Sequence, residues 1–336
     1  MVQKVRVAIN GFGRIGRAAF KIALDNKKVE VVAINDLVAP SVLAYLLKYD
    51  SVYNTYDKKV TADSKHVIVN GKKYPVFQER EPKRLPWKKL GVDVVLECTG
   101  FFLDTAGAGQ HLRAGAKKVV ISAPGKDDVA NTHVFGTLET QKHVKHGQVV
   151  SNASCTTNCI SPVMQVLATV FGIEKAMMTT AHAYTASQGL VDEPNSKDMR
   201  EGRAAAMNLV PTHTGAAEAT AKVVPALQGK FTGISIRVPV ICGSLSDVTC
   251  VLKKNVTAEQ VNNAFRRAAK QPLFKNILEV SDAPLVSSDI IGNPHSAIVD
   301  TTFTRVVDGN LVKVLAWYDN EWGYAHRLVE MAVAVS

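Results

Sequence analysis

The sequence predicts an α/β protein in which a doubly wound parallel sheet is followed by an α+β domain with a mostly antiparallel sheet. In the first half of the chain, short apolar strand patterns alternate with helix-like stretches, which is typical of parallel sheets covered by helices on both faces. After about residue 151 the strand patterns become longer, as in antiparallel sheets backed by helices. The length of 336 residues fits two domains of about 100–200 residues each.

We expect a first domain over residues 1–154 and a second over residues 155–318. The expected elements of the first are a strand, a helix, a second strand, a hairpin around Asn70-Gly71 and three more strands: Val5–Asn10, Arg14–Asp25, Val29–Asn35, Val67–Val69 with Tyr74–Phe77, Val92–Glu97, Val119–Ser122 and Gln148–Val150.

In the second domain we expect one helix and four long strands: Thr156–Phe171, then Ala176–Thr180, Gly233–Val238, Asp247–Leu252 and Ala297–Phe303. A polar stretch from Thr185 to Arg203 has almost no apolar periodicity, and a loop of that length is usually functional. The amphipathic run Glu321–Val335 predicts a final helix, within about residues 319–336, that packs back on the first domain.

Composition is that of an ordinary globular protein, with 46% hydrophobic and 21% charged residues. No apolar run approaches the ~18–20 residues of a membrane span, and no signal-peptide pattern opens the chain, so we expect a cytoplasmic protein.

The net charge of +10 allows nucleic-acid binding, but the lysines are scattered, which favours a basic enzyme acting on anions. Five cysteines without a CxxC pair indicate neither a disulfide scaffold nor a metal site.

A nucleotide-binding signal follows the first strand. Gly11-Phe12-Gly13-Arg14-Ile15-Gly16 lies between that strand and a helix, and Asp36 ends the next strand, which is the context a Rossmann dinucleotide site requires. The glycines let backbone N–H groups approach a pyrophosphate, and Asp36 would accept hydrogen bonds from a ribose. The alternative is a plain strand-turn-helix. Two further strand ends, Cys98-Thr99-Gly100 and Ser122-Ala123-Pro124-Gly125, are candidate cofactor contacts or simple loops.

A reactive cysteine is predicted in Ser151-Asn152-Ala153-Ser154-Cys155-Thr156-Thr157-Asn158-Cys159. Asn, Ser and Thr favour helix N-caps, so Cys155 falls at a helix start, where the dipole and a nearby imidazole favour a thiolate. Cys159 lies one turn deeper, where packing or a redox backup is expected rather than a nucleophile. A buried structural thiol remains the alternative for Cys155.

Spacing alone does not single out the partner base. His182 ends a strand that could deliver it to a cleft, but the chain has nine histidines. We expect four of the others to lie in polar, surface-like surroundings: His111, His133, His143 and His146.

With these motifs in order along nearly the whole chain, the sequence resembles phosphorylating glyceraldehyde-3-phosphate dehydrogenases. The segments that carry the resemblance are NGFGRIGR at Asn10–Arg17, SNASCTTNC at Ser151–Cys159, HAYT at His182–Thr185, TGAA at Thr214–Ala217 and WYDNEWGY at Trp317–Tyr324. SNASCTTNC is highly specific, whereas a GxGxxG pattern alone is generic.

The resemblance implies a role for each matching residue. Cys155 would be the nucleophile and His182 its base. Attacking inorganic phosphate would be held by Ser154, Thr156, Thr214 and Gly215, with Arg200 nearby, and the substrate's own phosphate by Thr185 and Arg237. The implied NAD contacts are Arg14, Ile15, Asp36, Arg80, Ser122 and Asn320, beside Gly11, Gly13 and Gly16 of the glycine loop. The resemblance also implies a homotetramer.

Three rival functions stay open. Erythrose-4-phosphate dehydrogenase shares the cysteine motif, although the Thr214-Gly215 pair argues for the phosphorylating enzyme. A non-enzymatic nucleic-acid binder would use the positive charge, and a thiol hydrolase would need no dinucleotide motif. His213, Gly125 and Glu193 depart from the usual family residues, and Glu193 puts the cofactor and interface contacts of the polar loop in question.

Overall fold

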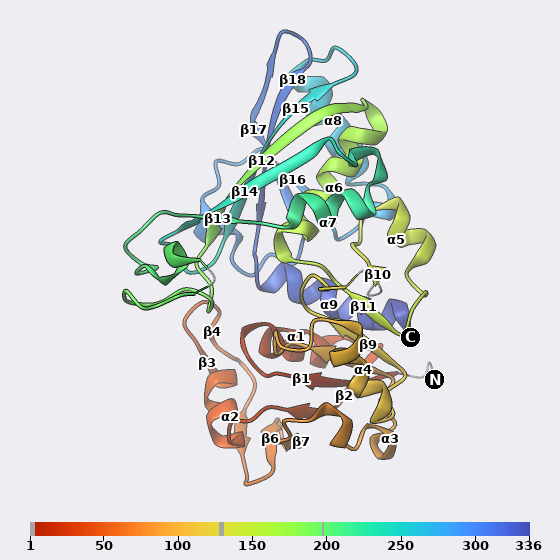
Figure 1. Cartoon of the computed structure of the whole chain (residues 1–336), viewed down its shortest axis with the longest axis vertical. Coiled ribbons are helices and arrows are strands. Elements are labelled where there is room, and N and C mark those ends of the chain that lie inside the picture. Colours follow the sequence, from red (N-terminus) through yellow and green to blue (C-terminus); the bar gives the residue numbers. More distant parts are fainter. Residues whose placement is uncertain (1–3, 128–130, 197) are drawn as a thin grey trace. The chain divides into compact units, whose positions relative to one another are not determined.

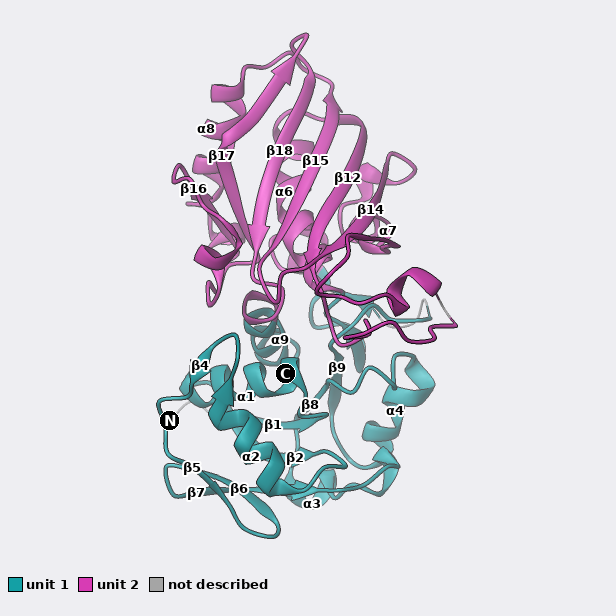
Figure 2. Ribbon diagram, turned by 90° about the vertical axis from the view of Figure 1, so that its left-hand side faces the viewer, with its two compact units in different colours: residues 1–133, 143–153, 325–336 teal, residues 134–142, 154–324 magenta. Residues whose placement is uncertain are grey.

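The computed structural model describes residues 4–127, 131–196 and 198–336, and the chain forms two compact units (Figures 1 and 2). The first unit comprises residues 1–133, 143–153 and 325–336, and the second comprises residues 134–142 and 154–324. The short segment 134–142 therefore belongs to the second unit, and most of the terminal helix belongs to the first. None of the helices in the described residues is long and apolar enough to cross a bilayer.

The first unit is built on a sheet whose strands run in the order β10-β11-β9-β8-β1-β2-β7-β6-β5. Pairing is parallel from β10 to β7 and antiparallel in the hairpin that β7 forms with β6 and β5. The strands are β1 Val5–Asn10, β2 Val29–Asn35, β5 Val60–Ala62, β6 His66–Val69, β7 Lys72–Phe77, β8 Val94–Glu97, β9 Lys118–Ile121, β10 Asn131–Thr132 and β11 Val149–Ser151.

Helices of this unit connect the parallel strands, as the sequence predicts. They are α1 Arg14–Asp25, α2 Pro40–Lys48, α3 Trp87–Leu90 and α4 Thr105–Arg113, with η1 Pro82–Arg84 and the small hairpin β3 Tyr49–Asp50 with β4 Asn54–Thr55. From β1 the chain passes to β2 on one side and later returns to β8 on the other. The strand order thus reverses at β1, and ligands of such sheets bind at the carboxyl ends of strands where this reversal occurs.

The second unit carries a sheet in the order β13-β14-β12-β15-β18-β17-β16. Four neighbouring pairs are antiparallel, and the β12–β14 and β16–β17 pairs are parallel, which confirms a mostly antiparallel sheet. The strands are β12 Ile173–Ala183, β13 Val210–His213, β14 Phe231–Val238, β15 Ser244–Leu252, β16 Leu278–Ser281, β17 Ala297–Val307 and β18 Leu311–Tyr318.

Helices cover one face of this sheet. They are α6 Cys155–Val170, α7 Ala216–Val223 and α8 Ala258–Ala268 (Figure 2). Short turns η2 Met199–Gly202, η3 Pro225–Leu227, η4 Pro272–Phe274 and η5 Ser287–Ile290 fill the connections, and α5 Leu138–His143 and α9 Trp322–Val335 run across the division between the units. Burial alternates with period two along β15, so one face packs under the helices and the other does not.

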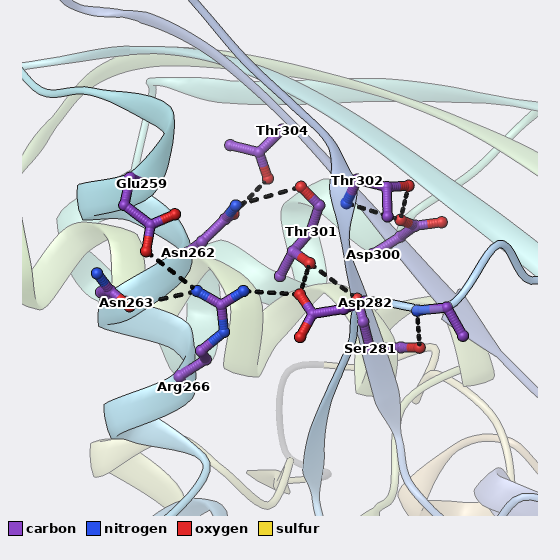
Figure 3. A network of polar contacts seen from close by, with 11 residues as sticks. Glu259, Asn262, Asn263, Arg266, Ser281, Asp282, Asp300, Thr301, Thr302 and Thr304 are labelled. Carbon is purple, nitrogen blue, oxygen red and sulfur yellow. Dashed lines mark hydrogen bonds and ion pairs between the residues drawn. The ribbon is translucent and has the colours of Figure 1, made fainter.

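A polar network fixes α8 to the edge of this sheet (Figure 3). Arg266 on α8 donates a 2.6 Å hydrogen bond to Asp282, which also accepts a short bond from the Thr301 hydroxyl on β17. Asn262 on α8 donates to the Thr301 carbonyl oxygen and accepts from Thr304. Asn262, Thr301 and Thr304 are buried, so their bonds satisfy polar groups between helix and strand, whereas the Arg266–Asp282 pair is exposed.

Candidate active site

A cleft of about 560 Å³ opens in the first unit at the carboxyl ends of the parallel strands. Its walls come from the residues that follow β1, β2, β7 and β8, and they include Gly11, Gly13, Asp36, Arg80 and Thr99. Four of the residues predicted for a dinucleotide site are therefore brought together here, at the point where the strand order reverses.

The three glycines of the loop differ in what a side chain would meet. A Cβ on Gly11, which has φ +90°, would lie 2.7 Å from the Thr99 nitrogen, and one on Gly16 would lie 2.1 Å from the Gly11 oxygen. Those two positions therefore require glycine for packing. Gly13, the N-cap of α1, has no side-chain cap and nothing within 4 Å of its missing Cβ. Uncapped N–H groups beside open space are what a pyrophosphate needs.

Asp36 is held in place by backbone donors. Its Oδ2 accepts a 2.7 Å hydrogen bond from the Phe12 nitrogen, and its Oδ1 accepts from the Val38 nitrogen at 3.0 Å. The carboxylate is therefore oriented before any ligand arrives, and it shares the cleft with the guanidinium-bearing Arg80.

The other predicted cofactor residues lie elsewhere. Arg14 pairs with Asp50 at 2.8 Å, and Ile15 follows it in the first turn of α1. The Ser122 nitrogen, just after β9, donates to the Glu97 oxygen at 2.9 Å. Asn320 belongs to the second unit, where its side-chain oxygen accepts from the Gly243 nitrogen and the Ser244 hydroxyl.

In the second unit, Cys155 is the first residue of α6 and its sulfur lies 3.3 Å from Nε2 of His182. The helix begins here because Ser154 is its N-cap and accepts from the Thr157 nitrogen at 3.1 Å. Ala153, just before the cap, has φ 54°, a left-handed conformation that is uncommon for residues other than glycine and is often found at active sites. The structure thus joins the two residues predicted as nucleophile and base.

His182 reaches the cysteine because it lies near the end of β12, on the face of the sheet that the helices cover. Thr180 lies two positions before it on the same face of the strand, and both residues are buried. On the neighbouring strand β14, Arg237 stands in register with His182. Its Nη1 lies 2.7 Å from Nδ1 of the imidazole, and the Ala183 oxygen lies 2.6 Å from the same atom. A guanidinium only donates and a carbonyl only accepts, so the two contacts belong to different tautomers of His182. Nε2 can accept the thiol proton in the tautomer whose Nδ1–H donates to the Ala183 oxygen.

The pKa shifts of Cys155 and His182 differ from what the sequence predicts. Burial raises the pKa of the Cys155 thiol, and the nearby Arg237 charge and the hydrogen bonds from Thr156 oppose that rise only in part. Burial, followed by the charge of Arg237, lowers the pKa of His182 to about 4. The helix start does favour the thiolate through these hydrogen bonds, but desolvation of the sulfur has the larger effect, so the pKa of the thiol is raised. The neutral imidazole is instead placed to take the thiol proton.

The second cysteine of the motif has the structural role that was predicted. Cys159 is fully buried, and its sulfur lies 3.8 Å from the Ala316 oxygen. Burial raises the pKa of this thiol well above its usual range. It is therefore a packing residue and a poor nucleophile.

The residues predicted to bind phosphate are distributed over several elements of the second unit. Thr156 is buried, and its hydroxyl lies 2.9 Å from the hydroxyl of Tyr318. Thr214 accepts from the Ala216 nitrogen and Gly215 caps α7, with nothing within 4 Å of its missing Cβ. Thr185 and Arg200 lie in the polar loop, where the Thr185 hydroxyl contacts Ser187 at 3.0 Å and Arg200 is exposed on η2.

Two of the histidines were placed wrongly by the sequence analysis. His111 is fully buried and His133 is nearly so, whereas both were expected in surface-like surroundings. His111 contacts Trp87 and Glu97, which are distant in sequence. Tyr318 was not predicted as a site residue, but its hydroxyl lies 2.9 Å from the hydroxyls of both Thr156 and Thr180. It stands in the WYDNEWGY segment, the one signal that could have drawn attention to it.

A Rossmann-type sheet with a glycine loop and an oriented acidic residue, together with a second unit bearing a thiol–imidazole pair, defines the class of cysteine-dependent dinucleotide dehydrogenases. Residues 5–105 match the family model "Glyceraldehyde 3-phosphate dehydrogenase, NAD binding domain", and residues 154–320 match "Glyceraldehyde 3-phosphate dehydrogenase, C-terminal domain". The chain belongs to the glyceraldehyde-3-phosphate dehydrogenase family, and NAD is its cofactor.

Curated relatives match along nearly the full length. The chain is 50% identical over 328 residues to glyceraldehyde-3-phosphate dehydrogenase 2 of Bacillus subtilis, covering 98% of this chain and 96% of that protein. It is 49% identical over 334 residues to the enzyme of Borreliella burgdorferi, covering 98% of each chain. Against the enzyme of Geobacillus stearothermophilus it is 49% identical over 332 residues, covering 99% of this chain and 98% of that protein. These matches do not favour an erythrose-4-phosphate dehydrogenase or a non-enzymatic role.

Proposed function

We propose that this chain catalyses the NAD-dependent oxidation and phosphorylation of glyceraldehyde 3-phosphate to 1,3-bisphosphoglycerate, with Cys155 as the nucleophile and His182 as the base. The observation that carries the proposal is the 3.3 Å contact between the Cys155 sulfur and His182 Nε2 at the start of α6, in a chain of this family. A thiol beside a neutral imidazole is the usual arrangement of an activated cysteine.

In the first half of the reaction the sulfur of Cys155 attacks the aldehyde carbon while His182 takes the thiol proton. Transfer of a proton to the carbonyl oxygen gives a thiohemiacetal, and N–H groups at the start of α6 stabilise the negative charge that develops on that oxygen. His182 then removes the hydroxyl proton, and the carbon becomes a thioester. NAD, when bound, supplies the acceptor for the hydride that leaves this carbon.

In the second half inorganic phosphate attacks the thioester carbon. The carbon–sulfur bond breaks, the thiol group is restored and the acyl phosphate leaves. Two anionic groups must then be held at once, and charge-assisted hydrogen bonds suit that task. We assign the attacking phosphate to Ser154, Thr156, Arg200, Thr214 and Gly215, and the phosphate of the substrate to Thr185 and Arg237.

The cofactor site fits NAD on the chemistry of its walls. Open space at Gly13, where α1 begins without a side-chain cap, supports a place for the pyrophosphate. The oriented carboxylate of Asp36 supports a place for the adenosine ribose. The residues that would hold the cofactor are Gly11, Gly13, Arg14, Ile15, Gly16, Asp36, Arg80, Ser122 and Asn320.

The reaction is tested by NADH formation from glyceraldehyde 3-phosphate, with inorganic phosphate present or omitted. We expect sustained turnover only when phosphate is present, because the thioester otherwise accumulates. Erythrose 4-phosphate should be the poorer substrate by kcat/KM. Equal turnover without phosphate, or a preference for erythrose 4-phosphate, would reject the proposed reaction.

Asp36→Ala is expected to reduce a strong preference for NAD over NADP. The extra phosphate of NADP would lie against the Asp36 carboxylate, and two unit charges ~4 Å apart repel by ~4 kcal/mol at an effective dielectric of ~20. Half of that repulsion still gives roughly thirty-fold discrimination. The measurement is kcat/KM with each cofactor. Glu79→Gln, which removes another carboxylate from the same cleft, is the control and should leave the NAD:NADP ratio unchanged.

Arg237→Leu is expected to raise the KM for glyceraldehyde 3-phosphate roughly ten- to a hundred-fold more than the KM for glyceraldehyde, because a charge-assisted hydrogen bond to phosphate is worth ~1.5–3 kcal/mol. Arg237 also contacts His182, so kcat should fall for both substrates. Only the difference in KM reports on phosphate. Arg305→Leu, at an exposed position over the Phe303 ring, is the control. An equal rise in KM for both substrates would mean that Arg237 acts only through its contact with the imidazole.

We also propose a homotetramer in the cytoplasm. The sheet face of the second unit that lacks helices exposes apolar side chains, including Met177, 68% exposed, and Ile234, 50% exposed. The polar loop adds Leu190 and Met199, which are 78% and 88% exposed. Apolar groups this exposed on one unit indicate a protein interface.

Met177→Lys with Ile234→Lys should lower the mass measured by sedimentation below that of four chains. Lys222→Glu, on α7 of the opposite face, should leave the mass unchanged. An unaltered tetramer in the double variant would exclude this face from the interface.

A further inference from the structure

A buried carboxylate lies directly behind the cofactor cleft. Glu97 is the last residue of β8 and is fully buried. Its Oε1 accepts hydrogen bonds from the nitrogen and the hydroxyl of Thr99, the former at 2.8 Å. Its Oε2 accepts from Asn10 Nδ2 at 2.5 Å and contacts His111 Nε2 at 3.0 Å. None of the partners recorded for it in the described residues is a lysine or arginine.

Trp87 fixes the tautomer of His111. The indole Nε1 of Trp87 lies 2.9 Å from His111 Nδ1, and an indole N–H can only donate. Nδ1 must therefore accept, which assigns the proton of the ring to Nε2 and directs it at Glu97. A proton on Nδ1 would meet the indole N–H, so Nδ1 cannot be the donor of this ring. His111 thus acts as a fixed donor to Glu97 through Nε2.

The same network continues into the wall of the cleft. Asn10 Oδ1 accepts a 2.7 Å hydrogen bond from Asn35 Nδ2, and Asn35 Oδ1 accepts from the Glu79 nitrogen at 3.0 Å. Asn10, Asn35 and Thr99 line the cleft that also contains Asp36. The Thr99 hydroxyl in turn accepts from the Phe101 nitrogen at 3.1 Å. The orientations of Asn10, Asn35 and Thr99 therefore depend on both carboxylate oxygens of Glu97 accepting hydrogen bonds.

A carboxylate suits this position and an amide does not. Four donors converge on the two oxygens of Glu97, so every partner is satisfied only if both oxygens accept. A glutamine of the same shape would turn its NH₂ group toward either the Thr99 pair or the pair formed by Asn10 and His111. His111 cannot reverse its tautomer, because Trp87 occupies Nδ1. A buried polar group left without its partner is costly, so the wall would have to rearrange.

We infer that Glu97 is a positioning residue of the cofactor site, which acts on NAD through Thr99 and Asn10, and that His111 and Trp87 hold Glu97 in that role. The inference rests on the proposal that this cleft binds NAD. Glu97 does not line the cleft, so it is not a catalytic residue.

The test is the dissociation constant of NAD, measured by calorimetry on the full chain. Glu97→Gln should weaken NAD binding about tenfold or more, the effect of losing one hydrogen bond to a charged group. Alkylation of Cys155 by iodoacetamide in the second unit should keep its rate. Val94→Ala, a cavity in the same strand at a fully buried position, is the matched control. It should lower the melting temperature and leave NAD affinity within about twofold of the parent.

Two variants at His111 separate positioning from packing and also serve if Glu97→Gln does not fold. His111→Gln can still accept from Trp87 and donate to Glu97, and it should retain NAD affinity within about threefold. His111→Phe removes both bonds at similar size, and it should weaken NAD about tenfold and shift the fluorescence of Trp87. Equal NAD affinity in these two variants would overturn the inference, as would a Glu97→Gln protein that binds NAD like the parent.

The Asp36→Ala variant separates failure of the inference about Glu97 from failure of the proposal that this cleft binds NAD. If Asp36→Ala weakens NAD binding and Glu97→Gln does not, the cleft binds NAD without help from the buried carboxylate. If neither change affects NAD binding, the cleft is not the NAD site and both proposals fall.

Discussion

Cys155→Ala is expected to abolish dehydrogenase activity, with a loss of roughly 10⁴-fold or more, because the variant has no nucleophile to form the thioester. NAD binding should not change. Cys155 lies at the start of α6 in the second unit, whereas the glycine loop and Asp36 lie in the first. Activity is measured as NADH formation and binding by calorimetry. Near-normal turnover of the purified variant would reject Cys155 as the nucleophile.

Cys159→Ala is the matched control. This cysteine lies one turn further along α6 and is fully buried, and its high pKa leaves almost no thiolate. The variant should keep most of the activity and lose only some stability from the small cavity. Loss of activity in Cys159→Ala with retention in Cys155→Ala would mean that the two thiols have been assigned the wrong way round.

Local sequence patterns were sufficient for the start of the first unit. The strand Val5–Asn10, the helix Arg14–Asp25 and the strand Val29–Asn35 have the predicted bounds. Here the apolar runs, the glycine loop and the acidic strand end all specify the same structure. The helix Thr105–Arg113 was missed because its sequence TAGAGQHLR contains two glycines and little apolar periodicity. By contrast, the capping box of Thr257 and Gln260 is a sequence signal for the start of α8, which was not predicted.

The site shows where local patterns stop being informative. The sequence placed Cys155 at a helix start and His182 at a strand end, but their contact depends on tertiary structure, since 27 positions separate them. The approach of Arg237 to His182 follows from the register of β12 and β14, which no short window of sequence contains. His111 was misplaced for the same reason: its polar neighbours in sequence suggest a surface position, whereas Trp87 and Glu97 bury it.

The raised pKa of the cysteine could not be predicted for a related reason. A helix start can be read from Ser154 and its neighbours, and its effect on a thiol has a known sign. Desolvation depends on how completely other elements cover the sulfur, which the local sequence does not contain. In the structure that coverage has the larger effect on the pKa of Cys155. The imidazole therefore has to act as a base toward a thiol whose pKa is raised.

His182→Asn is expected to slow alkylation of Cys155 by iodoacetamide near neutral pH and to slow hydride transfer further. Each effect is expected to be ~10²-fold, the usual contribution of a positioned general base. In the parent, burial and then the Arg237 charge lower the pKa of His182 to about 4. The imidazole is thus neutral and active above that pH, and the rate should fall as the pH drops through about 4.

The His182→Asn variant should lack this fall in rate at low pH, the acid limb of the profile, since it carries no titrating base. In Arg237→Leu the limb should move to higher pH, because removal of the neighbouring positive charge lets the pKa of His182 rise. His66→Asn, at a histidine of the first unit that pairs with Asp63, is the control and should reproduce the parent profile. The measurement is the rate of alkylation and of single-turnover NADH formation as a function of pH. An alkylation profile in His182→Asn that superimposes on that of the parent would show that the imidazole does not activate this thiol.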